Sequence, residues 1–216
     1  MLVLGLTGGI ACGKSTVSAW LRDQGAYILD ADEFARQAVA PGSAGLADVL
    51  SAFGPEYQRE DGQLDRARLG ARVFSQPAAL QRLNGILHPR IVAAIRRHLD
   101  ELAALDPPLV VVDAALLLEL DLQPWCDAVL TIELDAPVQL ARLQSRNSLS
   151  QSDAAARIAA QSTQAFRAAR ATWVLLNNGT VSQLTHDLEQ FWRDLTAKFP
   201  GAVAPPIAQE TQHPVA

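Results

Sequence analysis

The hydrophobic positions of the chain fall into short apolar runs separated by stretches of helical spacing. The runs predict five strands, at residues 2–6, 27–29, 109–112, 128–132 and 173–176. The run at 109–112 is apolar at every position, which is typical of a strand covered on both faces. Because helical patterns separate the strands, we expect a mostly parallel α/β sheet with helices on both faces.

The longest helical stretch lies between the second and third expected strands, at residues 41–105. It is too long for a simple crossover, so we expect it to form a helical cap over the carboxyl edge of the sheet. Within it we expect a helix from Pro89 to Leu105, with proline in the first turn, where the missing N–H leaves no helical bond unmade. A final amphipathic helix is expected at residues 181–198.

These elements predict one unit at residues 1–199. Its parts are a core at about 1–40, 106–136 and 171–199, the helical block at 41–105, and a second helical segment at about 137–170. Residues 200–216 contain four prolines and few apolar anchors, so we expect a disordered tail there.

Composition narrows the class of protein. The 216 residues are 49% hydrophobic and carry a formal net charge of −5 with no basic run, so nucleic-acid binding is not expected. No apolar stretch reaches the roughly 18 residues of a membrane span, and the N-terminus lacks the charged start of a signal peptide. Two cysteines give no disulfide framework. We therefore expect a cytoplasmic protein, and we favour a monomer.

A glycine-rich loop after the first strand carries the clearest chemistry. Gly8-Gly9-Ile10-Ala11-Cys12-Gly13-Lys14-Ser15 matches the phosphate-loop pattern G-x-x-x-x-G-K-[ST]. Its glycines let successive N–H groups turn inward toward phosphate oxygens, and the following helix favours an anion at its N-terminus. Lys14 can reach the β- and γ-phosphates, and the Ser15 hydroxyl can bind Mg²⁺. We interpret Cys12 as a space-filling residue rather than a nucleophile.

The scarcity of lysine excludes one class of phosphate-loop protein. A GTPase needs a guanine-reading N-K-x-D segment, and the only lysine besides Lys14 is Lys198, which lacks that context. The small size disfavours motor and transporter ATPases. A kinase acting on a small molecule therefore fits best.

Two carboxylates follow the second expected strand. Asp30 and Asp32 come where that strand ends, and parallel strands end at the same sheet edge as the phosphate loop. A carboxylate there can orient an acceptor hydroxyl and take its proton, although either aspartate can instead cap a helix. Asp113 ends the third strand, and either a metal-assisting or a capping role fits it.

Further motifs continue in a fixed order along residues 3–195. They are Ala35-Arg36, Arg72-Val73-Phe74, Leu87-His88-Pro89, Leu116-Leu117-Leu118-Glu119, Gln139-Leu140, Arg142, Arg146, Arg157-Ile158, Gln161 and Asn177-Asn178-Gly179. With the phosphate loop, Thr16 and Asp32, these motifs make the chain resemble the dephospho-CoA kinases, the last enzymes of coenzyme A biosynthesis.

The resemblance implies Mg²⁺-ATP-dependent phosphorylation of the ribose 3′-hydroxyl of dephospho-CoA. It also implies a nucleotide-binding core, a helical acceptor-binding domain and a small lid. In this chain Asp32 would activate the hydroxyl, Lys14 would hold the transferring group, and Arg146 would neutralise developing charge. Arg36, His88 and Arg142 would contact the acceptor side.

Some interpretations stay open beside the resemblance. Arg142 and Arg146 share a helix face that can also be simply solvated, and Arg157, Arg167 and Arg170 are interpreted as surface or structural residues. The segments 113–119 and 172–176 depart from the family pattern, so the resemblance does not define the walls of the acceptor and adenine pockets. The alternative functions are another small-metabolite kinase, acting on a nucleoside or nucleotide, and a non-catalytic nucleotide-binding regulator.

Overall fold

A computed structural model describes residues 1–202. The chain divides into two compact units. One is formed by Met1–Leu29 together with the chain from Ala103 onward, and the other by Asp30–Leu102.

The first unit is built on a five-stranded sheet, in the order β2-β3-β1-β4-β5. Its strands are β1 (Leu2–Gly8), β2 (Tyr27–Asp30), β3 (Leu109–Asp113), β4 (Ala128–Glu133) and β5 (Trp173–Leu176). The pairs β1–β3, β1–β4 and β4–β5 are parallel. All five strands begin at the residue where the apolar run predicts them, and the expected parallel α/β fold is confirmed.

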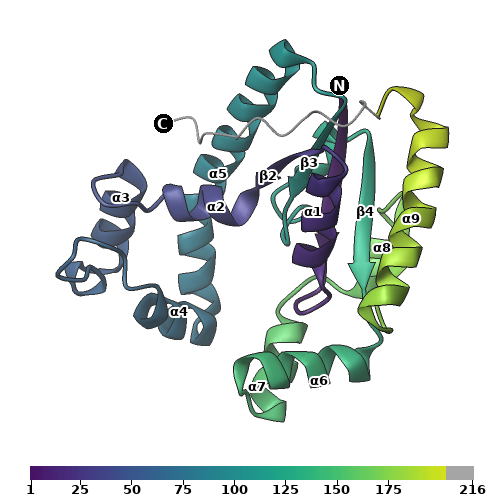
Figure 1. The fold of residues 1–216 in the computed structure, drawn as a ribbon. Coiled ribbons are helices and arrows are strands. Elements are labelled where there is room, and N and C mark those ends of the chain that lie inside the picture. Colours follow the sequence, from purple (N-terminus) through teal and green to yellow (C-terminus); the bar gives the residue numbers. More distant parts are fainter. Residues whose placement is uncertain (203–216) are drawn as a thin grey trace. The chain divides into compact units, whose positions relative to one another are not determined.

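Helices cover one face of the sheet. Helix α1 (Lys14–Asp23) contributes Val17 and Leu21, and α9 (Val181–Lys198) contributes Leu188 and Leu195, to a core that also contains Leu4 and Leu6 of β1 and Leu130 of β4. The two helices appear in Figure 1 beside the central strands. This packing follows from the alternation of β1, which sends every second side chain to the same face.

The opposite face is covered by the chain after β3 and by a short helix, α8 (Gln164–Ala168). A side chain at Gly5 would meet Cys126 Sγ at 3.0 Å and Leu117 Cδ2 at 3.1 Å, so this segment lies directly on β1. It includes a 3₁₀ turn, η2 (Gln123–Trp125). The three central strands, β3, β1 and β4, are thus buried on both sides, as their nearly continuous apolar sequences require, whereas the edge strand β5 leaves Val174 and Leu176 exposed.

Two helices and a 3₁₀ turn complete the first unit. Helices α6 (Ala136–Asn147) and α7 (Gln151–Ala159) contact each other between β4 and α8, and η3 (Pro200–Ala202) follows α9. Ala202 of η3 is buried. The rest of the segment expected as a tail, residues 203–216, lies outside the described residues.

The second unit is helical. It contains α2 (Ala31–Gln37), α3 (Ala44–Phe53), η1 (Pro55–Tyr57), α4 (Arg66–Ser75) and most of α5 (Pro77–Leu105). Buried residues of α3 and α4, including Val49, Phe53, Leu69 and Val73, form its core. Ser43 and Asp65 cap α3 and α4 by accepting the N–H groups of Leu46 and Arg68.

The expected helix start at Pro89 is wrong, because α5 begins at Pro77 and carries Pro89 in its interior. Proline there removes one helical hydrogen bond, to the carbonyl of Gly85. The apolar spacing nevertheless continues across the proline. Leu83 and Leu87 pack against the core on one side of it, and Ile91 and Ile95 are buried on the other. Burial of this stripe outweighs the local preference of proline for a helix end.

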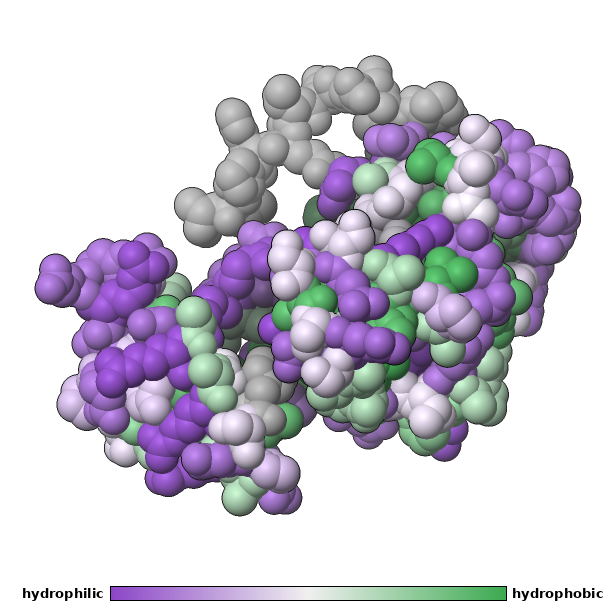
Figure 2. Space-filling view, turned by 90° about the horizontal axis from the view of Figure 1, so that it is seen from below, coloured by the Kyte–Doolittle hydropathy of each residue, from purple (hydrophilic) through white to green (hydrophobic). Residues whose placement is uncertain are grey.

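On the face shown in Figure 2, hydrophobic residues are scattered among polar ones. None of the helices within residues 1–202 combines the length and apolar character that crossing a bilayer requires.

Candidate active site

The glycine-rich loop joins β1 to α1, and its backbone adopts conformations that its sequence allows. Gly13 has φ 91°, in the left-handed region that favours glycine, and a Cβ there would lie 2.4 Å from Nδ2 of Asn177. At Gly8, where the loop begins, a Cβ would lie 2.3 Å from the Ile132 carbonyl oxygen of the neighbouring strand. Gly13 is the N-cap residue of α1, so the loop leads directly into a helix N-terminus, which favours anions.

Lys14 and Ser15 form the first turn of α1. The ammonium of Lys14 makes an ion pair with Asp113, whose side chain is 7% exposed at the end of β3. The register of the sheet places Asp113 opposite Leu6, one strand away from the loop. Ser15 and Thr16 are exposed. The loop therefore presents a cation, a hydroxyl and a carboxylate at one sheet edge, which is a set of groups suited to a phosphate chain with a hard metal ion.

Cys12 lies inside the loop but is 2% exposed. Burial raises the pKa of its thiol to about 11. Its carbonyl oxygen accepts a hydrogen bond from Asn177 Nδ2 at 2.9 Å. These contacts agree with a space-filling role, because a protonated, buried thiol is a poor nucleophile.

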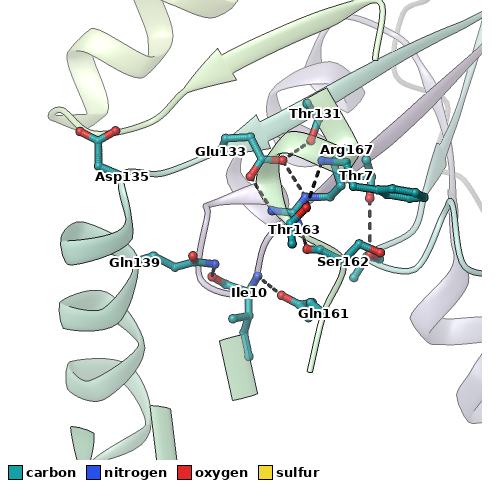
Figure 3. Close-up of polar contacts among 12 residues, drawn as sticks. Thr7, Ile10, Thr131, Glu133, Asp135, Gln139, Gln161, Ser162, Thr163 and Arg167 are labelled. Atoms are coloured by element: carbon teal, nitrogen blue, oxygen red, sulfur yellow. Dashed lines mark hydrogen bonds and ion pairs between the residues drawn. The ribbon is translucent and has the colours of Figure 1, made fainter. Parts of the chain in front are cut away.

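The Ile10 peptide groups are bonded by two glutamines (Figure 3). Its N–H donates to Gln161 Oε1 at 2.7 Å, and its carbonyl accepts from Gln139 Nε2 at 2.9 Å. Gln139 lies in α6, and Gln161 lies in the connection between α7 and α8. Both glutamines belong to the motifs behind the family resemblance, but the sequence alone does not show which groups their side chains contact.

A buried ion pair adjoins the loop. Arg167 of α8 donates from Nε and Nη2 to the two carboxylate oxygens of Glu133, at 2.7 and 2.6 Å. Arg167 is 6% and Glu133 2% exposed, so Arg167 is a structural residue rather than a surface one. Glu133 was missed at the sequence level. Its signal was an acidic residue directly after the apolar run 128–132.

The candidate acceptor residues Asp30, Asp32, Arg36 and His88 lie in the second unit. The Asp30 carboxylate accepts the N–H of Asp32 at 2.8 Å and so caps α2, and Arg36 pairs with Asp30 at 3.7 Å. Asp32 is exposed in the first turn of α2. His88 is half-buried on α5.

The two arginines of the segment expected to form a lid, Arg142 and Arg146, lie one turn apart on α6. Arg142 donates to the carbonyl of Gly179 at 3.3 Å, next to Asn178, whose side chain accepts the N–H of Asp135 at the start of α6. Arg146 is exposed and contacts only its neighbour Asn147, at 3.0 Å, among the hydrogen bonds within residues 1–202. Its guanidinium is thus accessible for an anion.

The parallel sheet in the order β2-β3-β1-β4-β5, with a phosphate loop after β1 and Lys14 at the start of α1, defines an α/β phosphate-loop nucleotide-binding fold, the class to which the small-molecule kinase expected from the sequence would belong. The model of the dephospho-CoA kinase family matches residues 2–183. The chain belongs to the dephospho-CoA kinase family.

Individual relatives agree with this assignment. The chain is 45% identical to the dephospho-CoA kinase of Anaeromyxobacter dehalogenans and 41% identical to that of Moorella thermoacetica, over 90% of this chain and 92% of each relative. A solved Thermus thermophilus structure matches with a TM-score of 0.73 at 33% identity, covering 91% of this chain and 97% of its own. The dephospho-CoA kinase of Campylobacter jejuni, at 23% identity, shares the fold with a TM-score of 0.69, over 91% and 98% of the two chains.

The comparisons confirm the family, the fold and the activity expected from the sequence. The chain is an enzyme of coenzyme A biosynthesis, a phosphotransferase that uses ATP to convert dephospho-CoA to coenzyme A. Neither alternative, a kinase for nucleosides or nucleotides or a non-catalytic regulator, is favoured.

Proposed function

We propose that the chain binds Mg²⁺-ATP at residues 8–16 and transfers the γ-phosphoryl group to the ribose 3′-hydroxyl of dephospho-CoA. The observation that carries the proposal is the position of Lys14, at the start of α1 and at the end of a loop that turns its backbone around Gly13. A lysine there can hold the transferring group while the N–H groups of the loop and helix bind the other phosphate oxygens. Transfer then depends mainly on positioning and on neutralising charge.

Ser15 and Asp113 fit the role of metal-binding residues, because Mg²⁺ prefers oxygen donors and usually keeps water and substrate phosphates as further ligands. Within residues 1–202, no group of three or more His, Cys, Asp or Glu side chains could hold a metal ion. We therefore propose that Mg²⁺ binds together with the nucleotide. When bound, it supplies charge neutralisation on the phosphate chain.

Asp32 is our candidate for the group that orients the acceptor hydroxyl and takes its proton. Asp30 already caps α2, so the Asp32 carboxylate is not needed for that purpose. The carboxylate is exposed, as a residue that meets a substrate must be before the substrate binds. This assignment separates a capping aspartate from a reacting one two residues further along the chain.

The remaining roles follow from the family resemblance and from the chemistry of each side chain. Arg146, with its accessible guanidinium, would neutralise charge on the transferring group, and Arg142 would bind the acceptor side. Arg36, on α2, and His88, in the helical block 41–105, would contact dephospho-CoA, with residues 137–170 acting as the lid. A monomeric state and a cytoplasmic setting stay predictions.

The test is a turnover assay with Mg²⁺-ATP, offering dephospho-CoA, adenosine and nucleoside monophosphates separately. We expect ADP only with dephospho-CoA, and phosphate on the 3′ position of the product by ³¹P NMR. ADP formation only with adenosine or a nucleotide would overturn the acceptor. ATP binding without turnover on any acceptor would overturn the catalytic assignment.

A substitution tests the assignment of Asp32. Asp32→Asn should lower kcat by about 10²–10⁴-fold, because general-base catalysis is worth that much, while ATP affinity stays within about twofold. Glu33→Gln is the matched control, since Glu33 is the exposed neighbour in the same helical turn, and we expect it to keep wild-type turnover. Full turnover by Asp32→Asn would remove Asp32 as the base.

A further inference from the structure

Ile10 stands in the middle of the phosphate loop, and both of its backbone polar groups are bonded to side chains from distant segments. Gln161 accepts its N–H at 2.7 Å, and Gln139 donates to its carbonyl at 2.9 Å. Figure 3 shows the two side chains approaching Ile10 from different sides. Gln139 is only 9% exposed, so its amide is committed to this contact rather than to water.

The residue after Ile10 explains why the loop needs this support. Ala11 has φ 63°, a left-handed conformation that is unfavourable for a residue with a Cβ. Gly13, two residues later, also has a positive φ. A loop with this backbone is held in shape by its surroundings rather than by its own preferences. The two glutamine bonds fix the peptide planes on both sides of Ile10, directly before the strained residue.

Gln161 is itself held in place by its neighbours. The carbonyl of Ser162 accepts a hydrogen bond from Nη1 of Arg167, and the Ser162 hydroxyl donates to Glu119. Arg167 in turn is fixed by its buried pair with Glu133. The side chain that bonds the Ile10 N–H therefore extends from a segment tied to the end of β4.

We propose that Gln139 and Gln161 are positioning residues for ATP, which fix the Ile10 peptide and thereby hold the phosphate loop in its binding shape. Both act through the loop rather than by contact with the nucleotide, because their amides are bonded to the backbone of Ile10. The proposal rests on the proposed function only in that residues 8–16 bind ATP. A preformed loop loses less conformational freedom when the phosphates bind. This smaller entropy cost increases the affinity for ATP.

The test combines two substitutions at each position, to methionine and to glutamate, with two readouts, ATP binding and hydrogen exchange of the loop. Gln161→Met and Gln139→Met keep the length of the side chain but remove its polar atoms. We expect each to weaken ATP binding about tenfold by calorimetry and to raise KM for ATP by a similar factor, with kcat and the KM for dephospho-CoA within about twofold. Hydrogen exchange of the peptide covering residues 8–13 should become faster in the ligand-free protein.

The glutamate variants separate positioning from a general loss of structure, because the two bonds have opposite polarity. Gln161→Glu keeps the acceptor for the Ile10 N–H, so the loop should regain protection from exchange. Gln139→Glu replaces a donor by an acceptor that faces a carbonyl, so the loop should stay unprotected. Gln151→Met, at an exposed glutamine that begins α7, is the control and should behave like the wild type in both readouts.

Two results would overturn the proposal. One is wild-type ATP affinity and exchange in both methionine variants. The other is equal weakening of ATP and dephospho-CoA together with a lowered melting temperature, which would show that the glutamines serve general stability. Calorimetry with ATP needs no acceptor, so a failure of wild-type turnover on dephospho-CoA would count against the proposed function alone.

Discussion

Replacing Glu133 by glutamine should destabilise the protein strongly, because it leaves the charge of Arg167 buried without a partner. The Glu133 carboxylate accepts three hydrogen bonds, from Thr131 Oγ1 at 2.6 Å and from Arg167 Nε and Nη2 at 2.7 and 2.6 Å. Burial by itself would lower the pKa of Arg167, but the hydrogen bond and charge of Glu133 outweigh burial and raise it. The guanidinium nevertheless stays charged when its partner is removed, because arginine is not deprotonated in proteins near neutral pH.

The size of the effect follows from the burial of both groups, whose side chains are 7% and 2% exposed. Removing one partner of such a pair costs about 3–5 kcal/mol in the free energy of unfolding. At roughly 2–4 °C per kcal/mol for a protein of this size, the melting temperature should fall by about 6–20 °C. The double variant Glu133→Leu/Arg167→Met removes both charges and should recover most of this loss, because a well-packed apolar pair is often as stable as a buried ion pair.

The assay is thermal and urea unfolding, followed by circular dichroism and tryptophan fluorescence, on the wild type, Glu133→Gln, Glu133→Leu, Arg167→Met and the double variant. The wild type, Glu133→Leu, Arg167→Met and the double variant give a double-mutant cycle that isolates the coupling between the two side chains. Arg157→Met, at an exposed arginine of α7, is the control and should stay within about 0.5 kcal/mol of the wild type. The reasoning is refuted if Glu133→Gln loses less than about 1 kcal/mol, or if the double variant loses the sum of the two single losses.

Two further predictions concern the loop and the thiols. Gly13→Ala should weaken ATP binding more than tenfold by calorimetry, because alanine is strained at φ 91° and its Cβ would lie 2.4 Å from Asn177 Nδ2; unchanged affinity would contradict this. Burial raises the pKa of Cys12 to about 11 and that of Cys126 to about 12, so iodoacetamide should label both slowly at pH 8 in the folded protein and rapidly in urea, as read by mass spectrometry. Equal labelling in both states would refute this expectation. Both thiols bind their protons more tightly when the protein is folded, so their contribution to stability is present below about pH 9 and is lost as the pH rises through about 11 for Cys12 and about 12 for Cys126.

The fold could be predicted where local pattern and tertiary packing favour the same structure. All five strands were found because each is a short apolar run bounded by turn residues, and β5 and α9 agree with the sequence pattern at both ends. At Pro89 the local sequence pattern and the tertiary packing favour different structures. The local preference of proline favours a helix start, but the stripe from Leu83 to Ile95 lies on both sides of it, and only packing shows that the stripe is buried as one helix.

The candidate site also has a part that could be predicted from the sequence and a part that could not. The residues of the phosphate loop are contiguous, so their spacing alone identifies the chemistry. The side chains that hold the loop come from far along the chain. Gln139 is 129 residues from Ile10, Gln161 is 151 residues away, and Asn177 is 165 residues from Cys12. A glutamine in a helix or connection has many ordinary uses, so no local pattern distinguishes one that bonds a loop backbone.

The phosphate-loop residues and the side chains that bond the loop lie far apart in the sequence, and this matters for ATP binding within the family. The loop supplies donors through its backbone, and a backbone conformation is set by whatever the chain packs around it. Ala11 is the clearest case, because a non-glycine residue at φ 63° shows that the surroundings determine the loop rather than its own sequence. Under the proposed binding of ATP at residues 8–16, we expect that a chain can keep every residue from Gly8 to Thr16 and still bind ATP poorly when the side chains that bond the loop change. The groups to compare between active and inactive relatives are therefore Gln139, Gln161 and Asn177, together with the motif.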